Sequence, residues 1–175
     1  MKPSSTFCLL GSSLLLTASA PPKPANLSWA GETVIFSFAT KTGKTAALCR
    51  GPKGAYLVYR FGTAANVELQ YPAKLDASSW QKFTYWSYQR GNPYLGIAEL
   101  KFQNQGVQYT ISDHTSAQYD KQHEEIYPRA VSIWVTVKGK EVSVVGNSDT
   151  AVGELDVVRN DHKVKLEKGM AEGSE

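Results

Sequence analysis

The chain has 175 residues and a formal net charge of +3, and 42% of its residues are hydrophobic while 20% are charged. Positive and negative residues are interspersed, so the composition indicates no nucleic-acid-binding or membrane-binding patch. The length suits one domain with a substantial core, and a count of two cysteines leaves little scope for disulfides.

Residues 1–20 have the profile of a secretory signal peptide. Lys2 precedes an apolar run over residues 7–16, and small residues follow it. The run is much shorter than the roughly twenty residues that span a bilayer as a helix, which favours a cleaved signal over a membrane anchor. Residues 21–31 are predicted to be a proline-rich linker. Because only Cys49 remains after cleavage, we expect a disulfide-free bacterial protein of the periplasm or the outside of the cell.

Residues 32–158 are predicted to form an antiparallel β-sandwich or barrel. Short β-rich runs recur with turn residues between them, which is typical of about eight or nine strands in such a fold. Strands are expected over residues 33–39, 44–49, 55–61, 66–71, 82–89, 94–102, 107–112, 130–137 and 141–145. Residues 151–158 fit a last strand or a short helix. The charge-rich residues 159–175 are predicted to be a disordered tail.

The run over residues 55–61 is almost wholly apolar, which predicts a central strand covered on both faces. Arg60 is its exception, and we expect its guanidinium to pair with a carboxylate such as Glu68 and to stack on an aromatic ring. Cys49 follows a run of small apolar residues, which favours a buried core position. An intermolecular bridge or a reactive thiol is the alternative for Cys49.

An aromatic-rich hairpin over residues 85–94 is the first candidate binding site. Its side chains are those that dominate protein interfaces, and aromatic rings also stack on sugars. The candidate residues are Tyr85, Trp86, Tyr88, Arg90 and Tyr94. In the alternative interpretation, strand alternation sends Tyr85 into the core while Trp86 and Tyr88 cover the other face of the sheet.

The polar segment over residues 113–128 is the second candidate site, since it breaks the alternation and is expected to be a long loop. It holds His114 and His123 together with several carboxylates. The two histidines do not have the spacing of a helical zinc site, and residues 21–175 contain no G-x-S-x-G motif. We therefore expect no catalytic residue, no metal and no cofactor.

Four runs of the sequence resemble a group of small exported bacterial β-rich proteins of unknown function. They are AYLVYRFGT and VELQYP between Cys49 and Pro72, FTYWSYQRG after them, and LKFQNQGVQY at residues 100–109. In size, export and β-rich character, the chain is also similar to periplasmic lysozyme inhibitors and to immunity proteins. The S-G-x-x-Y loop and the paired cysteines of the membrane-bound lysozyme inhibitors are absent. The likeness implies an architecture and carries over no functional residue.

The sequence thus predicts an exported protein that acts by binding, without enzymatic turnover. The favoured partner is a protein of the bacterial envelope, such as a cell-wall hydrolase or a toxin, held by the hairpin and by the polar segment. Carbohydrate binding by the same aromatic side chains is the alternative. A metal-dependent hydrolase at the polar segment is less favoured.

Overall fold

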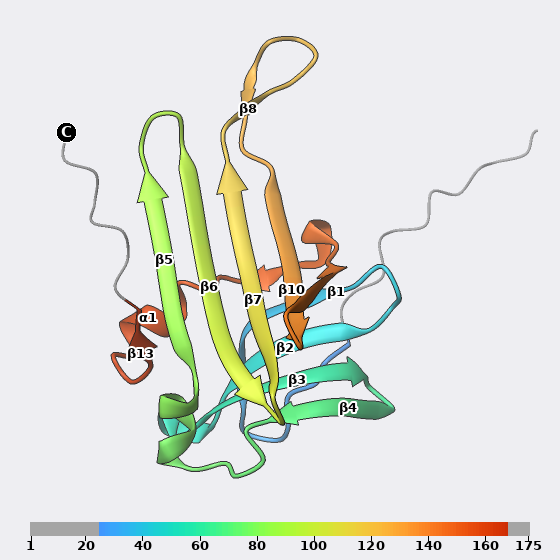
Figure 1. The fold of residues 1–175 in the computed structure, drawn as a ribbon, viewed down its shortest axis with the longest axis vertical. Helices are drawn as coiled ribbons and strands as arrows, with labels where there is room; N and C mark the ends of the chain where they lie inside the picture. The colour runs from blue at the N-terminus through green and yellow to red at the C-terminus, as the bar shows by residue number, and fades with distance from the viewer. Residues whose placement is uncertain (1–24, 168–175) are drawn as a thin grey trace, which may run out of the picture.

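A computed structural model describes residues 25–167, so the predicted signal peptide, residues 21–24 of the predicted linker and residues 168–175 lie outside the described part. These residues form an all-β sandwich of two main sheets, as the sequence predicted, and no closed barrel (Figure 1). We call the five-stranded sheet the small sheet and the six-stranded sheet the large sheet. Among residues 25–167, no helix is long and apolar enough to cross a membrane.

The small sheet is antiparallel throughout, in the order β12-β1-β2-β3-β4. Its strands are β1 (Thr33–Ala39), β2 (Thr45–Arg50), β3 (Leu57–Thr63), β4 (Asn66–Tyr71) and β12 (Val152–Gly153). β3 lies inside this sheet and both of its faces are buried, which confirms the predicted central strand. Its apolar side chains pack on both sides, with Leu57 and Tyr59 in the core between the sheets and Val58 in a second cluster behind.

The large sheet has the order β11-β10-β7-β6-β5-β13, and only β13 runs parallel to its neighbour. Its strands are β5 (Thr84–Arg90), β6 (Leu95–Asn104), β7 (Val107–Ser116), β10 (Arg129–Val137), β11 (Lys140–Val145) and β13 (Lys165–Leu166). A small ribbon of β8 (Gln118–Tyr119) and β9 (Glu125–Ile126) follows β7. Residues 151–158 supply β12 and the start of the short helix α1 (Val157–Asn160), so both predicted alternatives occur there.

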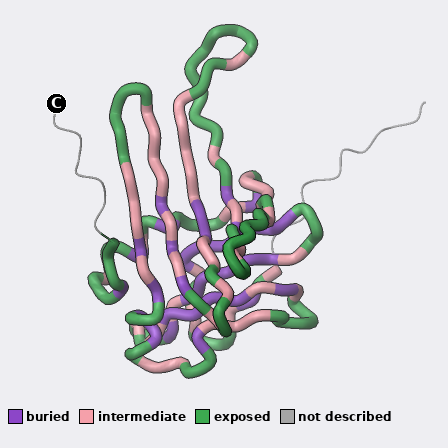
Figure 2. Tube along the Cα trace, viewed as in Figure 1, coloured by how far each residue is buried: buried purple, intermediate pink, exposed green. Residues whose placement is uncertain are grey.

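The two sheets overlap over only part of their area. The long strands of the large sheet run across the strands of the small sheet and continue well past them (Figure 1). Burial is concentrated where the sheets overlap, while the ends of the β5–β6 and β7–β10 connections are exposed (Figure 2). One half of the inner face of the large sheet, the face toward the small sheet, is therefore left without a covering sheet.

The N-terminal segment is not the expected linker over residues 25–31, because it packs against the outside of the small sheet. Leu27 is buried in the second cluster with Ala47, Cys49 and Val58. The ring of Trp29 lies 3.9 Å from the guanidinium carbon of Arg60. These apolar side chains cover residues on the outer face of the small sheet that would otherwise be exposed to water.

Arg60 pairs with Glu32 and not with Glu68, which corrects the predicted partner. Its Nη1 and Nη2 atoms donate to the two carboxylate oxygens of Glu32 at 2.6 and 2.9 Å, and both side chains are fully buried. Nη1 also donates to the carbonyl of Leu27, and Nε donates to Gln70. Burial raises the pKa of Glu32, but hydrogen bonds from Arg60, the Trp29 amide and Tyr56 together hold that pKa below its ordinary value.

The predicted disordered tail is ordered as far as Glu167. Val164 is buried in the main core, and Asp161 forms a 2.6 Å ion pair with Arg50 of the small sheet. β13 then adds to the edge of β5. The charge-rich composition hid this packing, because one or two buried apolar residues and a short strand suffice to fix such a segment.

Replacing Glu32 with alanine should lower the free energy of unfolding by about 3–5 kcal/mol, because it leaves the buried charge of Arg60 without a partner. The matched control is Glu68→Ala, which removes an exposed carboxylate 2.7 Å from Lys44 and should cost less than about 1 kcal/mol. Urea denaturation of the three proteins measures both values. Similar losses for the two variants would show that the buried pair does not hold the N-terminal segment.

Cys49 should be unreactive in the folded protein. Its side chain is completely buried, and burial raises the pKa of the thiol to about 11, so little thiolate exists at neutral pH. A thiol-reactive disulfide reagent should label Cys49 only after denaturation, with peptide mass spectrometry identifying the labelled cysteine. Rapid labelling of Cys49 without denaturant would support the reactive-thiol alternative.

Candidate functional site

The uncovered half of the inner face of the large sheet forms the floor of an open cleft of about 630 Å³. Strand register explains how the core passes into this cleft. One row across the sheet is apolar and buried, and it consists of Tyr85, Leu100, Ile111 and Ile133. The next row toward the tips contains Ser87, Ala98, Asp113 and Val131, and the row after it contains Gln89, Gly96, Thr115 and Arg129. Side chains on the same face thus change from apolar to polar as the small sheet ends.

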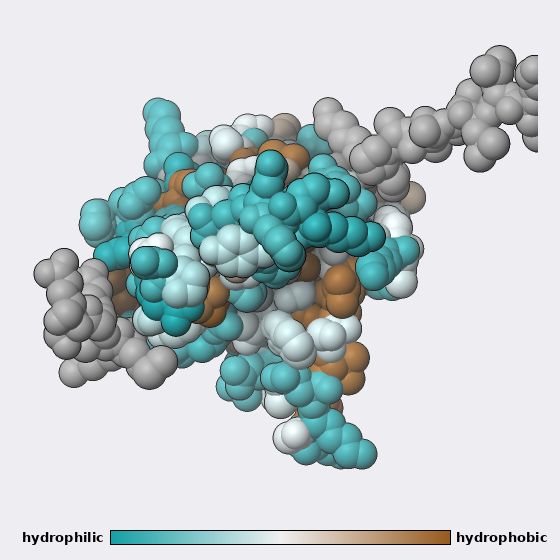
Figure 3. All heavy atoms as spheres, turned by 90° about the horizontal axis from the view of Figure 1, so that it is seen from above, coloured by the Kyte–Doolittle hydropathy of each residue, from teal (hydrophilic) through white to brown (hydrophobic). Residues whose placement is uncertain are grey.

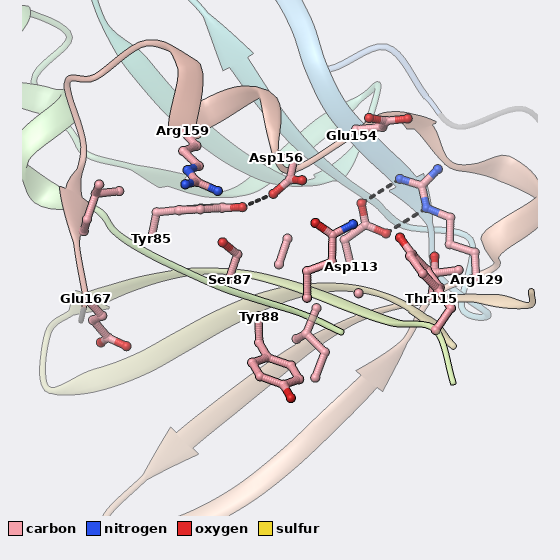
Figure 4. A pocket seen from close by; sticks show the side chains of 16 residues that line it. Tyr85, Ser87, Tyr88, Asp113, Thr115, Arg129, Glu154, Asp156, Arg159 and Glu167 are labelled. Carbon is pink, nitrogen blue, oxygen red and sulfur yellow. Dashed lines mark hydrogen bonds and ion pairs between the residues drawn. The ribbon is translucent and has the colours of Figure 1, made fainter. Parts of the chain in front are cut away.

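A segment that runs from the end of β12 into α1 crosses the boundary between core and cleft, and we call residues 153–159 the strap. Two of its apolar side chains, Leu155 and Val158, are fully buried in the core between the sheets. Its polar side chains, Glu154, Asp156 and Arg159, line the cleft from the side opposite β5 and β7 (Figure 4). The strap therefore forms the second wall of the site.

One polar link fixes the strap to the strands through an ion pair between Arg129 and Asp113. Two hydrogen bonds of 2.7 Å join the guanidinium of Arg129 to the two oxygens of Asp113. Arg129 Nη2 also donates to the carbonyl of Gly153 at 2.8 Å, and the amide of Leu155 donates to Asp113 at 3.3 Å. The hydrogen bond to Asp113 raises the pKa of Arg129, so this guanidinium is charged at any ordinary pH.

A second link fixes the other end of the strap. The hydroxyl of Tyr85 on β5 donates to the carboxylate of Asp156 (Figure 4). Burial, followed by this hydrogen bond to a carboxylate, raises the pKa of Tyr85 above its ordinary range, so the phenol stays protonated and remains a donor. The two links together hold both ends of the strap against the large sheet and so define this wall of the cleft.

The charges of the cleft are of both signs. Asp113 and Arg129 satisfy each other, and Glu167 pairs with Lys101 at 2.9 Å. The side chains of Glu154 and Arg159 form no hydrogen bond or ion pair with any other residue of the described part, and both residues are exposed. A ligand in the cleft would thus meet one carboxylate and one guanidinium that have no partner among residues 25–167.

The predicted aromatic hairpin is divided between the two faces of the large sheet. Tyr85 points inward to the core and the strap, whereas Trp86 lies on the outer face with the Lys101 ammonium 5.7 Å from its ring. Tyr88 borders the cleft, but its ring points away from the strap carboxylates (Figure 4). Arg90 is exposed at the end of β5, where its Nε donates to the carbonyl of Pro93. Strand alternation therefore prevents these four side chains from forming one patch.

Tyr94, the fifth residue of that hairpin, lies at the mouth of the cleft. Its ring contacts the ring of Tyr127, with 5.8 Å between their centroids. A Cβ atom at Gly96 would lie 3.0 Å from the Tyr94 hydroxyl, so the missing side chain of Gly96 makes room for this phenol over the sheet. Two segments that are distant in sequence thus build one aromatic edge.

The polar segment over residues 113–128 is not a single loop. β7 continues to Ser116, because polar residues can extend a strand where its face is open to solvent, and β8 and β9 form a ribbon beyond it. His114 is half-buried on the outer face of β7, and its Nε2 atom is buried without a hydrogen-bond partner within the described part. His123 is exposed in the turn of the ribbon, at a φ of 62°. No group of three metal-ligating side chains within residues 25–167 could hold an ion, so the hydrolase alternative gains no support here.

Several residues of the cleft were not predicted. Arg129, Glu154, Asp156 and Arg159 line it. Arg129 lies just before the strand predicted over residues 130–137, Glu154 and Asp156 fall in the predicted terminal element over residues 151–158, and Arg159 begins the predicted disordered tail. The register of β7 against β10, which places Arg129 diagonally beside Asp113, was the signal that could have found the first of them. Comparison with family models, with curated proteins and with solved structures found no match.

Tyr85→Phe should lower the free energy of unfolding by about 1 kcal/mol, because it removes the hydrogen bond to Asp156 and keeps the ring. Hydrogen exchange should become faster in the strap and stay unchanged in β6. Tyr88→Phe is the matched control, since the Tyr88 hydroxyl forms no hydrogen bond with other residues of the described part. Unchanged exchange in the strap of Tyr85→Phe would mean that the apolar contacts of Leu155 and Val158 hold it alone.

Proposed function

We propose that this is an exported bacterial protein that binds a protein partner in the periplasm or outside the cell, without turnover. The observation that carries the proposal is the projection of the large sheet beyond the small sheet (Figure 1). Its end brings together the two segments that the sequence singled out, the β5–β6 connection and the β8–β9 ribbon. We call the exposed side chains Arg90, Tyr119 and Ile126 at this end the tip.

The chemistry of the tip suits a protein interface. Tyr119 is 73% exposed and Ile126 is 40% exposed, so two large side chains at this end are in contact with water. Tyrosine and arginine are the residues most often found as energetic hot spots in interfaces, because they bury much area and retain polar groups. Seen from above, the surface of the molecule is mostly hydrophilic with a few hydrophobic patches (Figure 3), and a polar rim around a few apolar side chains is typical of protein interfaces.

The partner class follows from the predicted compartment. If residues 1–20 direct export, the proteins available for binding are those of the envelope, and cell-wall hydrolases and secreted toxins are the partners we favour. The projecting end would then act as an inhibitor or immunity surface that covers part of the partner.

Arg90→Ala combined with Tyr119→Ala should weaken binding of the partner about thirtyfold or more, which corresponds to the loss of at least one hot spot. The wild type first captures partners from periplasmic extract, and mass spectrometry must identify a hydrolase or toxin whose activity falls on binding. Titration of that purified partner then gives the dissociation constants. The control is Val142→Ala on β11, which removes a 63% exposed apolar side chain of another surface.

Equal affinity of the wild type and the tip double variant would remove the tip from the interface. A stronger effect of Val142→Ala would move the interface to the β10–β11 hairpin, where Trp134 and Val145 are also exposed. Circular dichroism and urea denaturation of each variant check that the fold is intact before binding is compared.

A further inference from the structure

We infer that the cleft between the strap and the large sheet is a saccharide-binding site, separate from the tip and independent of the proposed protein partner. The first argument is its form. The cleft is open, and its volume of about 630 Å³ lies within the range of roughly 300–1,000 Å³ that small-molecule sites occupy. Its walls are held in place by the two links of the strap, so a ligand would not have to organise them.

The second argument is the kind of hydrogen-bonding groups in the cleft. Asp156 and Glu154 offer acceptor oxygens, Arg159 offers donors, and the rows on the sheet add the hydroxyl of Ser87 and the amide of Gln89. A simple anion would face the carboxylates, a simple cation would face the guanidinium groups, and an apolar ligand would leave all these groups without partners. Each hydroxyl of a sugar both donates and accepts, so a polyhydroxylated ligand satisfies donors and acceptors together.

The third argument is the aromatic edge at the mouth. Tyr94 lies over the sheet at Gly96, and Tyr127 meets it edge to face. A tyrosine ring offers an apolar face for the C–H side of a sugar and a hydroxyl for its polar side. The arrangement therefore combines a ring at the entrance with charged, planar side chains deeper in the cleft.

The fourth argument is the presence of two charged side chains, Glu154 and Arg159, without a partner among residues 25–167. Arg159 and Glu154 are exposed on one wall, and neither side chain forms a hydrogen bond or ion pair with another residue between 25 and 167. Hydrogen bonds from charged groups to neutral hydroxyls are stronger than those between neutral groups. These two residues should therefore determine the affinity, while Asp113 and Arg129 position the strap.

The test is a titration of the ¹⁵N-labelled protein with three hexasaccharides, made of β-1,4-linked glucose, α-1,4-linked glucose and β-1,4-linked N-acetylglucosamine. At least one should give saturable chemical-shift changes in β5, in the strap and at residues 94–96. Glu154→Gln and Arg159→Gln should each raise the dissociation constant of that saccharide about tenfold. Both side chains are exposed, so neither change should disturb folding.

Controls separate this site from the tip. The double variant Arg90→Ala with Tyr119→Ala should bind the saccharide as the wild type does, and Arg159→Gln should bind the protein partner as the wild type does. A Gly-Lys repeat peptide is titrated as the cationic probe. The inference would be overturned if none of the three saccharides gave saturable changes, if only the peptide gave shift changes, or if the shifts were confined to other surfaces. It would also be overturned if neither cleft substitution altered the affinity for the saccharide.

Discussion

The large sheet is longer than the sheet that covers it, and this difference in length shapes the rest of the molecule. Where the sheets overlap, rows of apolar side chains such as Leu100 and Ile111 meet the small sheet and are lost from water. Past its edge the same face must accept water, so the rows become polar. The strap closes the gap at the edge, with Leu155 completing the core below and Asp156 facing the cleft above. The cleft therefore results from the way the core ends.

A buried charge holds the opposite side of the sandwich together. Arg60 lies on the outer face of the small sheet, where Glu32, Leu27 and Trp29 enclose it. An apolar pair of similar volume could give equal or greater stability, since both charges lose their hydration when they are buried. The guanidinium instead imposes geometry, because its N–H groups donate to one carboxylate and one carbonyl in fixed directions. It thereby fixes where the N-terminal segment lies on the sheet.

The fold could be predicted from the local alternation of apolar and polar residues along the chain. This pattern gave no information on contacts between side chains that are distant in sequence. Residues 33–39 and 66–71 were predicted with the bounds that the strands have, because a two-residue period depends only on neighbours. The partner of Arg60 was missed, since Glu32 directly follows residues 21–31, whose prolines suggested a linker that does not pack on the sheet. Of the residues predicted in the aromatic hairpin, Tyr85 and Tyr94 lie at the cleft, while Trp86 and Arg90 lie elsewhere. The position of Arg159 in the cleft could not be predicted, because it depends on the burial of Val158 one residue earlier.

The packing of the N-terminal segment also moves the boundary of the folding unit. A chain that began at Glu32 would contain every strand described above, yet it would expose Val58 and Cys49 to water and leave Arg60 without Leu27 and Trp29. The residues soon after the predicted cleavage site are thus part of the domain's own architecture. Any trimming of the chain beyond Ala25 would therefore alter its stability as well as its length.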